Sequence, residues 1–362
     1  MNFDPFSPLA LTRGPALPNR FMLAPLTNMQ SRPDGTLSDE EFRWLTMRAQ
    51  GGFGLTMTCA AHVQANGQGF AGQLGIWSDA HIPGLTRLAD AIRTAGSRSS
   101  VQLHHAGMRS PAELIGETPV CPWDDPETGS RALATAEVEA VIEAFIAAGL
   151  RAEAAGFDGV ELHSAHGYLL GQFLDAGHNL RSDGFGGTFA HRRRVLDLVI
   201  DGLRARSRPD FQIGVRLSPE RFGIVTPEAL ELAGSLMTSG RIDYLDMSLW
   251  DCFKQPVDPA YAGKPLIEWF ADLPRGTAAF GVAGKIMAAA DVRRCFAAGV
   301  DFVLIGRGAI LHHDFVRKVA ADTEFEPIAC PVSRDHLRAE GLAENFVTYM
   351  DGWKGFVASE AA

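Results

Sequence analysis

The chain has 362 residues, of which 46% are hydrophobic and 21% charged, and its formal net charge is -10. Such a composition is typical of a globular protein with a large core, and the acidic balance argues against a nucleic-acid binder, which needs a basic face. No apolar run in the sequence approaches the ~18 residues of a membrane-spanning helix.

The five cysteines are far apart and include no CxxC pair. This spacing argues against a disulfide framework and against a zinc or iron-sulfur site, so no bound metal is expected. The N-terminal residues 1–6 carry an acid and a proline where a signal peptide would have positive charge and an apolar core. A cytoplasmic location is therefore expected.

From the N-terminus onward, a proline-rich segment over residues 1–19 is expected to form an extended cover with a hairpin. Short apolar segments then alternate with segments of helical period. The predicted strands lie at residues 21–25, 53–59, 100–104, 160–163, 211–217, 244–248, 278–282 and 302–305. The predicted helices lie at 38–50, 81–95, 135–155, 190–206, from 226 onward, 265–273, 288–298 and 310–321.

Two helix starts carry capping signals. Ser38 is followed three residues later by Glu41, which predicts a capping box, and Thr226 is the expected cap of a helix with Pro227 in its first turn. Within the helix at 190–206, the basic run Arg192 to Arg194 is expected to be a solvated face with ion pairs.

Eight strand-helix units predict an α/β fold, a closed (β/α)₈ (TIM) barrel, because near-continuous apolar strands imply burial on both faces. An open Rossmann-like sheet is the alternative, but the first strand-helix turn lacks its glycine fingerprint. The expected organisation is a single domain over residues 1–362: the cover at 1–19, the barrel at 20–322 and a C-terminal tail at 323–362.

The connections that follow strands three, four and six are long, over 106–134, 164–189 and 249–262. In a barrel these loops emerge at the C-terminal face, where sites of this fold are built. The site is expected there.

Three polar rings, His163, His166 and Tyr168, follow the fourth strand within six positions. Two imidazoles and a phenol can bind a substrate oxygen and deliver a proton, which is acid-base equipment. Half-exposed histidines with a packing tyrosine are the plainer interpretation.

Glycine-rich turns end strands seven and eight, at 281–285 and 306–308. Barrels commonly bind phosphate at these two turns, and Arg307 adds a guanidinium there. A phosphate-bearing ligand is expected at this side of the mouth.

Longer motifs carry a family resemblance. The segment from His163 to Leu170, the run Asn179 to Gly187 and the cluster His191 to Arg194 resemble the Old Yellow Enzyme family of FMN-dependent NAD(P)H oxidoreductases (ene-reductases). The similarity extends from Phe6 through Gln102 to Arg307, and so covers nearly the whole chain apart from the tail.

The resemblance implies bound FMN as cofactor and NAD(P)H as hydride donor. The implied FMN-binding residues are Ala24, Pro25, Leu26, Thr27, Ala60, Gln102, Arg216, Val282, Ala283, Gly284, Gly306 and Arg307. Arg216 would stabilise negative charge on the reduced ring, although it could instead pair with a buried acid.

The implied reaction is reduction of the C=C bond of an α,β-unsaturated carbonyl or nitro compound by ping-pong hydride transfer. His163 and His166 would bind the activating oxygen, and Tyr168 would donate the proton. The substrate-facing shell would add Met29 and Trp250, with Phe70 and Phe253 as further candidates. The expected partner is a small activated alkene, with no nucleic acid or membrane; Tyr349 and Trp353 in the tail leave a homo-oligomer open.

Two other functions remain open from the residues. A flavin-free barrel lyase or aldolase would need a Schiff-base lysine or a carboxylate cluster for a metal, and the nearest candidates, Lys285 and Glu161, do not form one. A non-catalytic flavin-binding module is the third reading.

Overall fold

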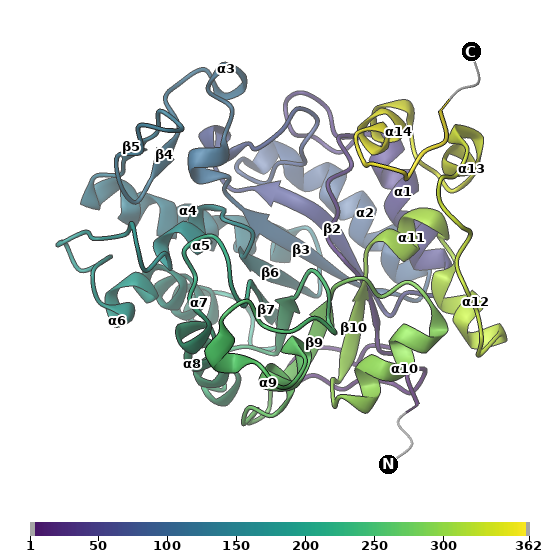
Figure 1. The fold of residues 1–362 in the computed structure, drawn as a ribbon. Coiled ribbons are helices and arrows are strands. Elements are labelled where there is room, and N and C mark those ends of the chain that lie inside the picture. Colours follow the sequence, from purple (N-terminus) through teal and green to yellow (C-terminus); the bar gives the residue numbers. More distant parts are fainter. Residues whose placement is uncertain (1–3, 360–362) are drawn as a thin grey trace.

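The barrel predicted from the sequence is present in the computed structural model, which describes residues 4–359 (Figure 1). Within these residues eight parallel strands close in the order β1-β10-β9-β8-β7-β6-β3-β2. Their bounds are β1 (Phe21–Leu23), β2 (Leu55–His62), β3 (Arg98–His104), β6 (Gly159–Ser164), β7 (Gln212–Leu217), β8 (Tyr244–Ser248), β9 (Ala279–Ala283) and β10 (Phe302–Ile305). A small separate pair, β4 (Val120–Cys121) and β5 (Arg131–Ala132), lies in the connection after β3.

Helices surround the barrel and extend into the tail (Figure 1). Their bounds are α1 (Asp39–Gln50), α2 (Ile82–Thr94), α3 (Ala112–Ile115), α4 (Thr135–Ala154), α5 (Leu169–Phe173), α6 (Phe189–Arg192), α7 (Arg194–Arg206), α8 (Thr226–Thr238), α9 (Leu266–Ala271), α10 (Ala289–Ala297), α11 (Arg307–Leu311), α12 (Phe315–Ala321), α13 (Arg334–Ala339) and α14 (Glu344–Asp351). None of the described helices is both long and apolar enough to cross a membrane.

Several predicted helix details were wrong. The last barrel helix is two helices, α11 and α12, because His312 takes an extended backbone and its ring accepts a hydrogen bond from the amide of Ile328 at 3.0 Å. The cap of α8 is Val225, one residue before the predicted Thr226. The ion pairs expected of the basic run are present, Arg192 with Glu228 and Arg193 with Asp197, but Arg192 is buried instead of solvated and also donates to the carbonyl oxygen of Gly187 at 2.5 Å.

Large aromatic rings fill the interior of the barrel. The N-terminal cover packs against this interior core. Tyr244 and Phe302 are buried inside, and a Cβ on Gly214 or Gly281 would come within 2.0 Å and 2.1 Å of these two rings. Glycine is therefore required at both strand positions. The backbones of Leu9 and Leu17 pair in the predicted hairpin, and both side chains join this core. Residues 1–3 of the predicted cover lie outside the described residues.

The loop after β1 is fixed by a buried acid. The side chain of Ser38 caps α1 by accepting from the amide of Glu41, as predicted. The carboxylate of Glu41, however, turns inward and accepts hydrogen bonds from Asn28 at 3.0 Å, from Cys59 and from Ser31. Burial raises the pKa of Glu41, while these three donors oppose the shift. The loop that carries Thr27 is held on α1 in this way.

The C-terminal tail docks on the same chain, beside α1 (Figure 1). Phe346 of α14 meets Trp44 edge-on with ring centroids 4.9 Å apart, and the amide of Ala343 donates to Gln30 at 2.8 Å. The tail therefore adds a wall to the barrel mouth.

Candidate active site

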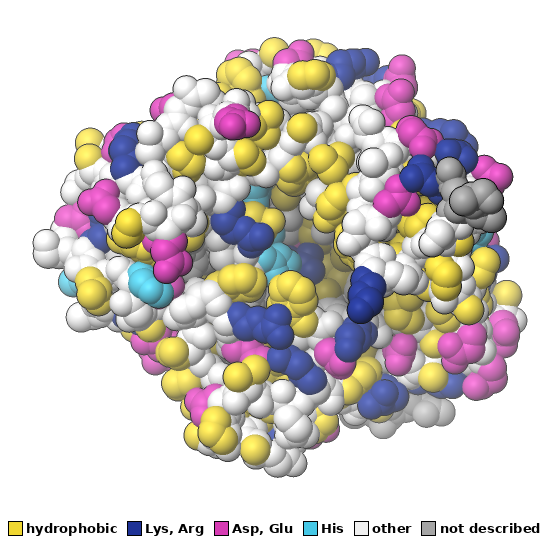
Figure 2. All heavy atoms as spheres, turned by 45° about the horizontal axis from the view of Figure 1, so that its top comes forward, with side chains coloured by type: hydrophobic (Ala, Val, Ile, Leu, Met, Phe, Trp, Pro, Cys, Tyr) yellow, Lys and Arg dark blue, Asp and Glu magenta, His cyan; other side chains and the backbone are white. Residues whose placement is uncertain are grey.

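A cavity of about 850 Å³ opens at the C-terminal ends of the barrel strands. Figure 2 shows this face hollowed, with histidine inside the hollow and Lys and Arg side chains around it. It is lined by residues from all eight barrel strands or from the loops that follow them. The predicted site residues that line it are Ala24, Pro25, Leu26, Thr27, Ala60, Phe70, Gln102, His163, His166, Tyr168, Arg216, Trp250, Ala283, Gly284, Gly306 and Arg307.

Two predicted substrate contacts, Met29 and Phe253, need correction because neither residue lines the cavity. Met29 has a left-handed backbone (φ 56°), and that backbone lies against Gly72. The Val282 side chain is fully buried in the hydrophobic core, so only its backbone amide could face the phosphate, and that role stays a prediction. Phe253 packs beneath Arg294, whose guanidinium carbon is 3.7 Å from the ring centroid. Tyr349 and Trp353 line the cavity of their own chain.

The predicted polar rings do come together. The ring of His163 lies 5.0 Å from that of His166 and 5.0 Å from that of Tyr168, measured between centroids. A fourth ring, His104, was missed by the sequence reasoning and packs edge-on to Tyr168 at 4.3 Å. Its position in the Gln102-Leu-His-His105 end of β3 was the available signal. These four rings form one wall of the cavity.

Burial keeps these groups uncharged. Removal from water, followed by the nearby Arg216 and Arg109, lowers the pKa of His166 to about 3, and burial also lowers the pKa of His163 well below its usual range. The pKa of Tyr168 is raised by burial. Near neutral pH the wall therefore offers neutral imidazoles and a protonated phenol, all able to donate hydrogen bonds. The amide of Ala165 donates to Nδ1 of His163 at 3.4 Å, which leaves Nε2 as its N–H donor.

The two residues predicted to bind the flavin edge, Gln102 and Arg216, each contact a buried acid. Gln102 donates to Glu161 at 2.8 Å, and the guanidinium of Arg216 lies 3.1 Å from the carboxylate of Asp246. The alternative in which Arg216 pairs with a buried acid is thus realised, but Arg216 also lines the cavity. Burial raises the pKa of both acids, and the neighbouring Asp246 adds to the shift of Glu161.

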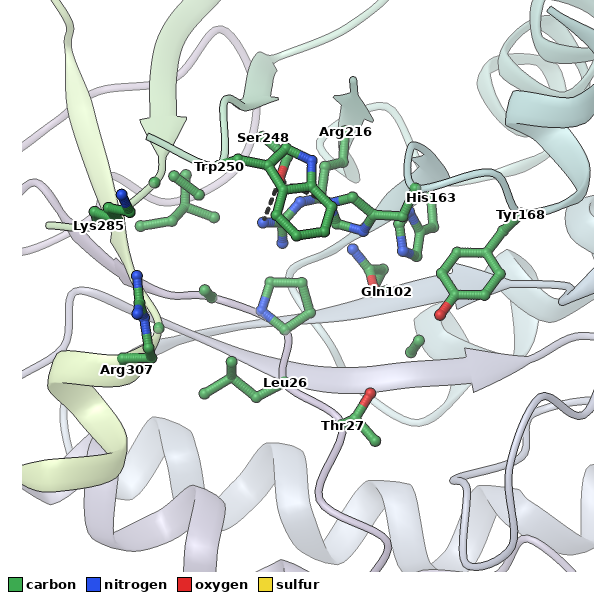
Figure 3. Close-up of a pocket in the computed structure, with 18 of the residues that line it drawn as sticks. Leu26, Thr27, Gln102, His163, Tyr168, Arg216, Ser248, Trp250, Lys285 and Arg307 are labelled. Atoms are coloured by element: carbon green, nitrogen blue, oxygen red, sulfur yellow. Dashed lines mark hydrogen bonds between the residues drawn. The ribbon is translucent and has the colours of Figure 1, made fainter. Parts of the chain in front are cut away.

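Ser248 joins this layer to the ring wall. Its hydroxyl lies 2.7 Å from Nε2 of His166. It accepts from Arg216 at 3.4 Å, and Figure 3 shows these two side chains next to each other. Ser248 therefore links Arg216 and His166 through one hydrogen bond to each. Ser248 was not predicted as a site residue, because its strand end carried no sequence signal beyond a hydroxyl.

Backbone strain gathers at the mouth. Outside glycine, the described residues with positive φ are six, and five of them line the cavity: His166, Arg221, Phe222, Trp250 and Lys285. Left-handed backbone costs energy in residues with a Cβ and persists where the surroundings impose it, often at functional sites. The loops after β6, β7, β8 and β9 are therefore shaped to aim side chains into the mouth.

The cavity suits a flat ring with an anionic tail. Figure 3 shows Lys285 and Arg307 at one side, Tyr168 at the other, and Gln102 and Arg216 between them. The side chains of Ala24, Pro25, Leu26 and Ala60 give small or smooth apolar surface. The buried Nε of Arg216 has no hydrogen-bond partner of good geometry among the described residues, although the Asp246 carboxylate is near. A cationic end, an apolar floor and a buried guanidinium together fit FMN.

Comparison with known proteins decides the family. The model of the NADH:flavin oxidoreductase / NADH oxidase family matches residues 4–265. The chain belongs to this family. It is an FMN-dependent NAD(P)H oxidoreductase of the Old Yellow Enzyme group, as the sequence motifs predicted.

Individual members of the family match over most of the chain. The probable NADH-dependent flavin oxidoreductase YqiG of Bacillus subtilis is 33% identical, with 88% of each chain covered. The NADPH dehydrogenase of Listeria innocua is 30% identical over 87% of this chain and 94% of its own. Morphinone reductase in complex with tetrahydroNAD superimposes with a TM-score of 0.76 at 26% identity, covering 93% of this oxidoreductase and 94% of that chain. Two longer relatives are spanned over only 37% and 33% of their length. The flavin-free lyase reading has no support in this family.

Proposed function

We propose that this oxidoreductase reduces the electron-poor C=C bond of α,β-unsaturated carbonyl or nitro compounds. The observation that carries the proposal is one wall that holds neutral His163 and His166 beside a protonated Tyr168, in a cavity of about 850 Å³. A hydride carrier alone would not need hydrogen-bond donors and a proton donor on the same wall.

FMN, when bound, supplies a carrier that takes up a hydride from NAD(P)H and gives it to the alkene. The apolar floor of Ala24, Pro25, Leu26 and Ala60 would hold its ring. Gln102, Thr27 and Arg216 would bind its polar edges, and Ala283, Gly284, Gly306 and Arg307 its phosphate. All of these residues line the cavity.

His163 and His166 bind the activating oxygen of the alkene. Because both imidazoles are neutral, each donates one N–H hydrogen bond to the oxygen. Neither is an imidazolium that would transfer its proton to the oxygen. The donated hydrogen bonds withdraw electron density from the β-carbon and stabilise the negative charge that grows on the oxygen. Fixed donors in a site with little water stabilise that charge more strongly than bulk water does.

Tyr168 donates the proton that completes the reduction, to the carbon next to the activating group. Burial raises its pKa, so the phenol is protonated throughout the neutral range. The guanidinium of Arg109 lies 4.8 Å from the Tyr168 ring centroid and stabilises the phenolate left after proton transfer. The proton is regained from solvent, since Tyr168 is only partly buried.

The nicotinamide and the alkene use the cavity in turn, which gives ping-pong kinetics. All lining residues belong to one cavity at one end of the barrel. Described cysteines are all free thiols, which suits the reducing cytoplasm that we propose as its location.

Anaerobic absorbance spectroscopy tests the proposal. NADPH or NADH should bleach the yellow flavin of the purified protein, and cyclohexenone added afterwards should restore the colour at a rate proportional to its concentration. A protein that bleaches but stays colourless with cyclohexenone, a maleimide and a nitroalkene would refute alkene reduction and leave only the family's flavin chemistry.

A further inference from the structure

Cations crowd the cavity of an otherwise acidic chain. The sequence has 33 Lys and Arg against 43 Asp and Glu. The cavity lining reverses this balance, because its charged side chains are six cations and the single acid Asp251: Arg109, Arg216, Arg221, Lys254, Lys285 and Arg307. Figure 2 shows Lys and Arg side chains around the hollow. Such a lining concentrates anions at the mouth.

Four of these six cations already have a partner or a proposed role. Arg216 pairs with Asp246, Lys285 with Asp251 at 2.9 Å, and Lys254 with Glu220. Arg307 lies beside Lys285 at the proposed phosphate end (Figure 3). Arg109 and Arg221 remain, and neither forms an ion pair with any carboxylate in residues 4–359.

Arg109 is held against the ring wall from the loop after β3. It donates a hydrogen bond to the backbone oxygen of His166 at 2.6 Å, and its guanidinium carbon lies over the Tyr168 ring. A guanidinium has five N–H donors, and the structure assigns one of them to this bond. The remaining donors are available to a ligand.

Arg221 reaches the same wall from the loop after β7. Its guanidinium carbon is 5.0 Å from the Trp250 ring centroid, and that ring meets His166 edge-on at 5.9 Å. Both Arg221 (φ 71°) and Trp250 (φ 62°) have left-handed backbone. This conformation is unfavourable for residues with a Cβ, so the surrounding structure must hold the stacked pair at the mouth. Arg109 thus contacts the backbone of His166, and Arg221 stacks on the Trp250 ring that meets the His166 ring.

We propose that Arg109 and Arg221 form an anion-recognition pair that selects activated alkenes carrying a carboxylate remote from the double bond. The inference rests on the proposed alkene reduction and narrows its substrate class. A carboxylate suits two guanidiniums because its oxygens accept several charge-assisted hydrogen bonds, which are stronger than neutral ones. The activating oxygen would lie on His163 and His166, and the carboxylate would lie outward, between the two arginines.

A matched pair of aldehydes tests the proposal on the FMN-loaded enzyme. 4-Carboxycinnamaldehyde and its methyl ester share the same activated double bond and differ in charge at the far end. We expect kcat/KM for the acid to exceed that for the ester by about tenfold or more at low ionic strength, since charge-assisted hydrogen bonds are lost with the ester. The preference should shrink as salt is added.

Variants assign the preference to the two arginines. Arg109→Gln combined with Arg221→Gln should bring the acid-to-ester ratio close to one, whatever happens to the ester rate itself. Arg43→Gln, an exposed arginine of α1 outside the cavity lining, is the charge-matched control and should keep the ratio. An acid-to-ester ratio near one in the unchanged enzyme, or a ratio unaffected by the double variant, would overturn the proposal.

Two further measurements distinguish a failure of the carboxylate-recognition proposal from a failure of the proposed alkene reduction. Stopped-flow reduction by NADH and NADPH should be altered little by the double variant; a large loss there with an unchanged aldehyde ratio would assign the arginines to nucleotide phosphate and refute the proposal. Titration of the oxidised flavin spectrum with each aldehyde gives a Kd ratio without turnover. If neither aldehyde is reduced, alkene reduction fails, and this Kd ratio alone decides whether anion selection holds.

Discussion

The guanidinium of Arg216 lies 3.1 Å from the carboxylate of Asp246, and both side chains are buried on neighbouring strands at paired positions. The positive charge of Arg216, which is expected beside the flavin, is therefore partly compensated by the negative charge of Asp246. We expect Asp246 to weaken the stabilisation that Arg216 would give to the reduced cofactor, because an ion pair reduces the field of either partner.

Asp246→Asn should raise the midpoint potential of the bound flavin. The substitution removes the balancing negative charge, so Arg216 stabilises the added electrons more strongly; an effect on the order of 1 kcal/mol corresponds to roughly 20 mV for a two-electron couple. The potential should be measured by dye equilibration at pH 8, so that the raised pKa of Asp246 still leaves it ionised. Glu139→Gln, an exposed acid of α4, is the control. An unchanged or lowered potential in Asp246→Asn would show that Asp246 does not balance Arg216.

Tyr168→Phe should slow the alkene half-reaction and spare the nicotinamide half-reaction. Loss of a positioned proton donor costs about 10²- to 10⁴-fold in rate, whereas hydride uptake from NAD(P)H needs no proton from this residue. Stopped-flow absorbance of the flavin measures each half separately. Equal slowing of both halves would mean that Tyr168 shapes the cavity and does not deliver the proton.

Binding of a neutral phenol should not depend on pH between about 5.5 and 8. A histidine with an ordinary pKa would lose its proton in this range, and affinity that needed imidazolium would fall as the pH rises. The lowered pKa of His166, about 3, and that of His163 keep both rings neutral throughout. Titration of the long-wavelength absorbance with 4-methoxyphenol measures the affinity. A drop in affinity centred near pH 6.5 would contradict neutral imidazole donors.

Glu41→Ala should destabilise the protein by about 2–4 kcal/mol, because three buried donors lose their acceptor. These donors, on Asn28, Ser31 and Cys59, hold the loop after β1. Ser38→Ala removes only the cap of the same helix and should cost about 1 kcal/mol. Urea unfolding of both variants gives the comparison. Similar losses in the two would show that Glu41 acts as an ordinary helix residue.

The barrel could be predicted because each strand is a short apolar run bounded by turn residues. Two strands, β8 and β10, have the predicted bounds, and most other elements differ by a few residues at their ends. The helix predicted at 190–206 is instead two helices, α6 and α7, which meet at Arg193. Helix breaks were less predictable: the split at His312 depends on a contact with Ile328 that the local sequence does not contain.

The site was predictable where a motif follows one strand and less so where loops converge. His163, His166 and Tyr168 belong to one segment and line the cavity together. Arg109 and Arg221 come from two loops, and only the folded structure places Arg109 on the His166 backbone and Arg221 on Trp250, whose ring meets His166. Met29 was expected in the cavity lining and does not line it; its backbone is left-handed and lies against Gly72, which the local sequence did not indicate.

The crystal structure of the FMN-loaded protein with bound 4-methoxyphenol tests the central claim most directly. We expect the phenol ring to stack on the flavin, with its oxygen about 2.6–3.2 Å from the side-chain nitrogens of both His163 and His166. Tyr168 should line the same pocket above the flavin. A phenol bound elsewhere, or one stacked on the flavin with both imidazoles turned away from its oxygen, would contradict the assignment of these residues to substrate activation.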